Sequence, residues 1–141
     1  MISNDLLLLF NLAKVQSLMS KKFAALSVHG LGFSDFLILY LLNNAADNSM
    51  RRIDLADKMG LTASGVTRLL NPMEKTGLVG RDVNERDARV SYVIITDTGK
   101  RIFEDAVITA ESIAKELFPA KKNKSFQALS DLLFQLGGNI Q

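Results

Sequence analysis

The first segment of the chain carries apolar residues at helical spacing, with no glycine or proline between Asp5 and Leu26. Apolar side chains that recur every three or four residues predict a helix. The apolar face of this helix is wide, because further leucines and a valine lie beside the main stripe. Two interpretations of that width stay open: a helix buried in the core, or a helix that forms a dimer interface.

Short amphipathic helices follow in the middle of the chain. Ser34 is placed to cap a helix that runs to about residue 43. Ser49 then caps a short helix that Gly60 ends, and Thr62 caps a second short helix that Gly77 ends. Two helices joined by a tight turn that contains glycine are typical of a helix-turn-helix.

Two segments with the composition of β-strands come next. Residues 78–81 and 89–95 enclose a charged loop over residues 82–88. Thr96 then caps a long amphipathic helix that Pro119 stops, and a last amphipathic helix follows a basic loop. The expected fold is therefore mainly α: a winged helix-turn-helix with a small two-stranded β wing, flanked by N- and C-terminal helices.

The terminal helices would expose apolar surface in a monomer, which favours a homodimer. We expect an N-terminal dimerisation helix over residues 1–30, the winged helix-turn-helix over 31–100 and C-terminal dimerisation helices over 101–141. The expected interface residues are Leu6, Leu9, Phe10, Ala13, Ile113, Leu117, Phe118, Leu129, Leu132 and Leu133.

Composition narrows the classes of function. The net charge is only +2, but residues 51–101 hold ten Lys and Arg against seven Asp and Glu, so the basic excess lies in the helix-turn-helix segment. The chain has no cysteine and a single histidine, which argues against a metal site or a cofactor held by thiolates. No nucleophile with a paired base and no glycine-rich phosphate loop is present, so an enzyme is not expected. No apolar run approaches the ~20 residues of a membrane span, so we expect a cytoplasmic protein without a membrane partner.

Several motifs together resemble the multiple-antibiotic-resistance regulator (MarR) family. The match covers about residues 31–103, roughly half the chain, and the motifs are residues 31–34, 55–61, 67–70 and 74–81, Asp87 with Arg89 in the wing, and Thr96 with Gly99. The resemblance implies a homodimeric transcriptional regulator, here expected to be a repressor, that binds a pseudo-palindromic operator in double-stranded DNA. It also implies modulation by a small-molecule effector. The alternative is a winged-helix adaptor that contacts proteins and not DNA, since one fold serves both roles.

The expected DNA contacts lie on the second helix of the motif and on the wing. Arg68 is a candidate to read guanine or to contact phosphate, and Arg89 is expected in the narrow minor groove, held by Asp87. Arg51 and Arg52 are candidates for phosphate contacts at the edge of the site. The full set expected on the helix is Thr62, Ser64, Gly65, Thr67 and Arg68, and the set on the wing is Arg86, Asp87 and Arg89.

Pro72 lies inside the presumed recognition helix. Proline lacks the N–H that would pair with the carbonyl of Arg68, and its ring crowds that carbonyl. We therefore expect a bend or a one-turn break near Asn71.

Overall fold

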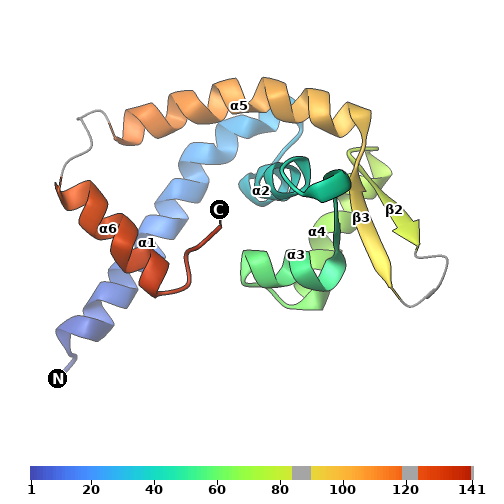
Figure 1. Cartoon of the computed structure of the whole chain (residues 1–141). Coiled ribbons are helices and arrows are strands. Elements are labelled where there is room, and N and C mark those ends of the chain that lie inside the picture. The colour runs from blue at the N-terminus through green and yellow to red at the C-terminus, as the bar shows by residue number, and fades with distance from the viewer. Residues whose placement is uncertain (84–89, 119–123, 141) are drawn as a thin grey trace.

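The structure is a computed structural model, and it describes residues 1–83, 90–118 and 124–140. Helices dominate it, with one small sheet (Figure 1). In chain order the elements are α1 (Asn4–Lys22), the 3-10 helix η1 (Phe23–His29), α2 (Phe33–Asn43), the 3-10 turn η2 (Ala46–Asn48), β1 (Ser49–Arg51), α3 (Arg52–Met59), α4 (Ala63–Lys75), β2 (Val79–Val83), β3 (Ser91–Ile95), α5 (Asp97–Leu117) and α6 (Lys124–Gln135).

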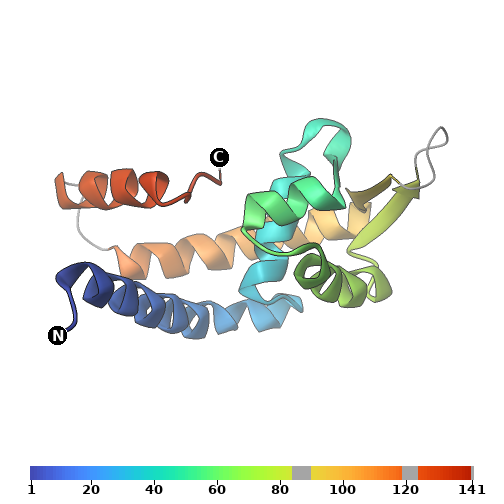
Figure 2. The same ribbon diagram turned by 90° about the horizontal axis from the view of Figure 1, so that it is seen from below.

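The long helix α5 connects two ends of an elongated molecule. At one end α2, α3 and α4 pack with the sheet, and at the other end α1 and α6 extend away from them (Figures 1 and 2). Among the described residues no single helix has both the length and the apolarity to cross a membrane. Only the pair Asn4–His29 and Phe33–Asn43, bent by 71°, meets the two criteria jointly.

The core lies beneath the winged end, around α2. Leu26, Ile38, Leu39, Leu42 and Leu55 are fully buried there, because α2 is covered by η1, α5, α4 and the sheet. The expected mainly α winged helix-turn-helix is confirmed.

The wing sheet has one more strand than the two that were expected. β3 lies in the centre, antiparallel to β2 on one side and to β1 on the other. Ser49 lies in β1 and pairs with Ile94 in β3. Ser49 therefore does not cap the next helix, and that expectation is wrong. The pairing joins segments 45 positions apart, and these backbone hydrogen bonds keep Ser49 extended.

Apart from Ser49 and Ser34, the helix ends follow the expected chemistry. Thr62 and Thr96 each accept a backbone N–H bond as N-caps, and Gly60 and Gly77, which were expected to end helices, adopt the left-handed conformation. Ser34 does not cap α2. The helix begins two residues earlier, with Gly32 as N-cap, and the Asp35 carboxylate accepts the Gly32 N–H at 2.8 Å.

α4 runs as one α-helix through Pro72, so the expected break near Asn71 is wrong. Pro72 lies on the exposed side of the helix, and Arg68, whose carbonyl loses its partner, is exposed as well. Water can therefore solvate that carbonyl. The N–H of Thr76 and the Thr76 hydroxyl both bond the Pro72 carbonyl and close the last turn.

The two terminal helices have no buried residue within this chain. The interpretation of α1 as a buried core helix is therefore wrong for the single chain. Of the expected interface residues, Ile113 alone is buried in the core, at 8% exposure, and the other nine are partly or largely exposed: Leu6, Leu9, Phe10, Ala13, Leu117, Phe118, Leu129, Leu132 and Leu133.

Candidate nucleic-acid interface

The helix α4 presents one apolar and one polar face. Val66, Leu70 and Met73 are buried on the inner face, and they fix the rotation of the helix about its axis. Ser64 and Arg68 consequently lie on the exposed face, where Arg68 has no hydrogen bond or ion pair to another described residue. A free guanidinium beside a short hydroxyl on an exposed helix is suited to contacts with base edges and phosphates.

The other three expected residues of α4 have contacts within the chain. Thr62 accepts the Gly65 N–H at 3.0 Å, and its hydroxyl lies 3.2 Å from that of Ser64. A Cβ at Gly65 would lie 3.2 Å from the Thr62 hydroxyl, so glycine leaves room for this cap. Thr67 is half-buried and accepts a hydrogen bond from Arg52 at 3.0 Å. Three of the five residues thus shape the start of the helix.

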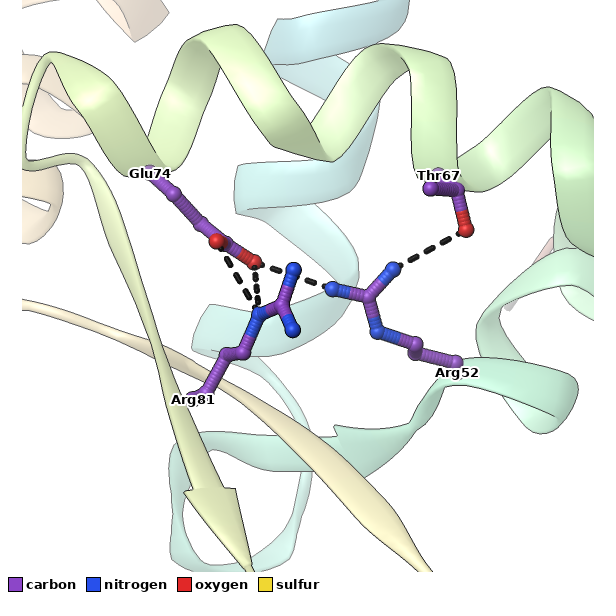
Figure 3. Close-up of polar contacts among 4 residues, drawn as sticks. All are labelled: Arg52, Thr67, Glu74 and Arg81. Carbon is purple, nitrogen blue, oxygen red and sulfur yellow. Dashed lines mark hydrogen bonds and ion pairs between the residues drawn. The ribbon is translucent and has the colours of Figure 1, made fainter.

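A carboxylate joins the recognition helix to its neighbours (Figure 3). Glu74, on the last turns of α4, accepts a hydrogen bond from the Arg52 guanidinium at 2.9 Å. The same carboxylate accepts the Nε–H of Arg81 on β2, with N–O distances of 2.9 and 3.0 Å. The Glu74 side chain therefore links the start of α3 and the base of the wing to the last turns of α4.

Arg81 is a residue that the sequence analysis missed. Its side chain is 53% exposed, and Glu74 engages only its Nε, so among the described residues its two terminal nitrogens have no partner (Figure 3). A guanidinium held on one side and open on the other is oriented for a phosphate. The signal was available as Glu74 and Arg81 on either side of the Gly77 turn, but only as part of a family motif.

Arg51 and Arg52 were both expected at phosphates, and the structure separates them. Arg51 is exposed and pairs with Asp54 at 3.0 Å, and this hydrogen bond together with the charge of Asp54 raises the pKa of the Arg51 guanidinium above its usual value. Arg52 is only 18% exposed, and its guanidinium bonds both Thr67 and Glu74. Arg52 therefore supports α4 from within, while Arg51 stays on the surface.

The wing strands β2 and β3 pair from Val79 with Ile95 to Val83 with Ser91 (Figure 1). Three of the expected DNA contacts belong to the segment between these strands. Arg86, Asp87 and Arg89 lie outside the described residues.

The base of the wing is fixed to α5. The Thr96 hydroxyl donates to the Gly77 carbonyl at 2.6 Å, with the Leu78 carbonyl as a second, longer acceptor at 3.0 Å, and it accepts the Gly99 N–H at 3.0 Å. A Cβ at Gly99 would collide with the Leu78 carbonyl, so the close approach requires glycine. This contact fixes the position of the wing base relative to the first turn of α5.

A cavity of about 360 Å³ lies between the winged end and α5. η1, α2 and α5 form its walls, and five of its lining residues are aromatic: Phe23, Phe33, Phe36, Tyr40 and Phe103. Its volume falls in the range that binds small molecules.

Comparisons with known proteins find transcriptional regulators among the relatives of this chain. A family model described as the MarR family matches residues 29–90. The chain is 34% identical over 99 residues to the HTH-type transcriptional regulator YfiV of Bacillus subtilis, which covers 67% of this chain and 61% of YfiV. It is 29% identical over 138 residues to YdgJ of the same organism, which covers 98% of this chain and 82% of YdgJ.

Solved structures share the fold. A MarR mutant from E. coli complexed with operator DNA superposes with a TM-score of 0.81 at 22% identity, over 94% of this chain and 96% of that one. The organohalide-sensing regulator RdhR in its 2,4-dichlorophenol-bound form superposes with a TM-score of 0.85 at 18% identity, over 99% of this chain and 83% of that one.

Proposed function

The chain belongs to the MarR family of transcriptional regulators, and on that basis we propose that it binds a pseudo-palindromic DNA operator as a homodimer. The observation that carries this proposal is the exposed face of α4, which presents Ser64 and Arg68, a residue without a partner among the described ones. At the other end of the same helix Glu74 holds Arg81 of the wing. The proposed effect on transcription is repression, with a small-molecule effector that modulates DNA binding.

In the proposed complex α4 enters the major groove and the wing reaches the adjacent minor groove. Arg68 and Ser64 contact base edges or phosphates, while Thr62, Gly65 and Thr67 hold the start of the helix in place. Arg51 and Arg81 contact phosphates at the edge. On the wing tip Arg89 enters the minor groove, Asp87 holds it, and Arg86 contacts phosphate.

The proposed dimer uses the two terminal helices. α1 exposes a run of large apolar side chains, Phe10 among them at 52%, and no residue of α6 is buried. Both helices extend away from the winged end (Figure 2). Surfaces of this kind are covered by a partner in soluble proteins, and a two-fold dimer would present two α4 helices to one face of the DNA.

The proposed effector site is the aromatic cavity. It lies where η1 and α5, which lead to the terminal helices, meet α2 of the winged unit. A ligand there would change how the DNA-binding end sits on α5. RdhR has been solved with 2,4-dichlorophenol bound, which supports a small-molecule role for this fold.

Selection of bound DNA from a random library, followed by footprinting of the purified protein, tests the function. We expect a site with two-fold symmetry and half-site centres about 10 bp apart. Affinity for duplex DNA should fall steeply as salt rises, because phosphate contacts release counterions. A stable monomer at micromolar concentration, or a selected site without symmetry, would contradict the proposal.

A matched pair of variants separates DNA binding from the adaptor alternative. Arg68→Ala removes a charge from the exposed face of α4, and Lys115→Ala removes an equal charge from the far end of α5 (Figure 1). Only Arg68→Ala should weaken operator binding. Equal effects of the two variants, or no salt-dependent DNA binding at all, would favour the adaptor.

A further inference from the structure

The walls of the cavity between α2 and α5 consist of stacked aromatic rings. Phe23 and Phe33 stack with ring centroids 4.4 Å apart, and Phe36 stacks on Phe103 at 5.2 Å. Tyr40 adds a tilted ring 6.5 Å from Phe103. Stacking covers one face of each ring, and the uncovered faces carry partial negative charge that attracts cations within about 6 Å.

One charged side chain, the carboxylate of Glu111, lines the same cavity. Within the part of the chain that the structure describes, Tyr40 is the other ionisable lining residue, and no Lys, Arg or His lines the cavity. Glu111 is exposed on α5 and forms no ion pair with another described residue. The other polar lining groups are the neutral amide of Asn44 and the hydroxyl of Tyr40. They can donate hydrogen bonds to an anion, but no positive charge in this lining would compensate it.

A second cavity differs from the aromatic cavity because positively charged side chains line it. It measures about 570 Å³ between α1 and the end of α5, and Lys21 and Lys22 line it together with apolar residues. An aromatic acid would find counter-charges there and none in the aromatic cavity.

From these walls and this charge pattern we infer that the aromatic cavity selects a small aromatic molecule with a positive charge, such as an arylalkyl ammonium, and rejects aromatic acids. The inference rests on the proposed function only in taking this cavity as the effector site. A cation gains from the ring faces and from the Glu111 carboxylate. A carboxylate would lose its hydration among apolar walls without a paired group. The volume of about 360 Å³ suits a molecule with one or two rings.

A set of three similar ligands tests the charge preference directly: naphthylmethylammonium, naphthylmethanol and naphthoate. Binding to the full-length protein without DNA is measured by titration calorimetry at fixed salt. In a Lys21→Ala, Lys22→Ala background, which removes the counter-charges of the second cavity, we expect the ammonium to bind most tightly, the alcohol about tenfold less tightly and the acid not measurably. Naphthoate binding as tightly as the ammonium would overturn the inference, and so would the absence of binding by all three at millimolar concentration.

Variants of Glu111 assign the effect to the cavity. Glu111→Gln should weaken ammonium binding about two- to fivefold, as expected for a partly solvated charge pair, and leave the alcohol unchanged. Glu111→Lys should reverse the preference between ammonium and acid. Glu104→Gln, an exposed position on the same helix outside the cavity lining, is the matched control and should change nothing. Equal effects of Glu111→Gln and Glu104→Gln would place the ligand elsewhere and overturn the inference.

A separate DNA-binding measurement distinguishes the two proposals. Operator release by naphthoate and not by the ammonium would leave the regulator function intact and overturn the charge inference. Tight ammonium binding by a protein that binds no DNA would support the charge preference of the aromatic cavity and overturn the proposed function.

Discussion

Replacing Glu74 by Gln keeps the shape of the side chain and removes the charge that two arginines share. The Arg52 pair is shielded, with side chains 18% and 22% exposed, whereas Arg81 is 53% exposed. Hydrogen bonds to charged groups in such shielded places contribute about 1.5–3 kcal/mol, and exposed pairs about 0.2–1 kcal/mol. Glu74→Gln should therefore lower the free energy of unfolding by about 2 kcal/mol, most of it through Arg52.

The chain contains a natural control for this estimate. Arg51 and Asp54 form an ion pair at 3.0 Å, close to the 2.9 Å of Arg52 and Glu74, but their side chains are 47% and 55% exposed. Two double-mutant cycles, Arg52→Met with Glu74→Gln and Arg51→Met with Asp54→Asn, should give clearly different coupling energies. The first should exceed about 1 kcal/mol and the second should stay below about 0.5 kcal/mol.

Urea unfolding at one fixed protein concentration gives these energies, because the stability of a dimer depends on concentration. Equal coupling in the two cycles would refute the argument from burial. Operator affinity gives an independent measurement. Glu74→Gln should weaken binding to every DNA sequence alike, since it releases Arg81 from its oriented position without touching a base-reading group.

Further outcomes follow from single positions. Gly99→Ala should destabilise the fold by about 2–3 kcal/mol because its Cβ would meet a backbone carbonyl of the wing base, whereas Gly80→Ala, with 3.5 Å to its nearest neighbour, should be tolerated in thermal unfolding. Pro72→Ala should raise the unfolding midpoint, with a gain of about 1 kcal/mol, because it restores a helix hydrogen bond in a helix that is already continuous. Arg68→Ala should cost about 1–3 kcal/mol of operator binding and relax one base position in a selection experiment, while an equal loss for all sequences would make it a phosphate contact. Arg89→Ala should weaken binding chiefly at sites with A·T-rich flanks, which a comparison of operator variants would show.

The sequence predicted the elements whose signals are local. The threonine caps at Thr62 and Thr96 and the left-handed glycines at Gly60 and Gly77 depend on a few neighbouring residues, and all four are confirmed. Helical periodicity similarly indicated the amphipathic helices, because the buried positions of α4 and α5 recur within each helix.

The features that were missed depend on distant partners. Ser49 has a good local signal for a cap, but its strand forms only because residues 91–95 lie beside it. Arg52 reads as a surface charge until Glu74, 22 positions later, is placed next to it. Pro72 is a local helix breaker, but Pro72 and Arg68 both lie on the exposed side of α4, and that orientation depends on how α4 packs.

Side-chain contacts join α3, α4, the wing and the start of α5 into one unit. Arg52 and Arg81 meet at the Glu74 carboxylate, and the Thr96 hydroxyl holds the carbonyls at the start of the wing against the first turn of α5. The aromatic cavity lies outside these contacts, between α2, η1 and the middle of α5. A ligand in that cavity would therefore leave the geometry of α4, the wing and the first turn of α5 unchanged and alter how α2 and η1 sit on the middle of α5. In a dimer this change alters the distance between the two α4 helices, so an effector should reduce affinity most for operators whose half-site spacing matches the free protein. A ligand that lowered affinity equally for an isolated half-site and for the full operator would contradict this mechanism.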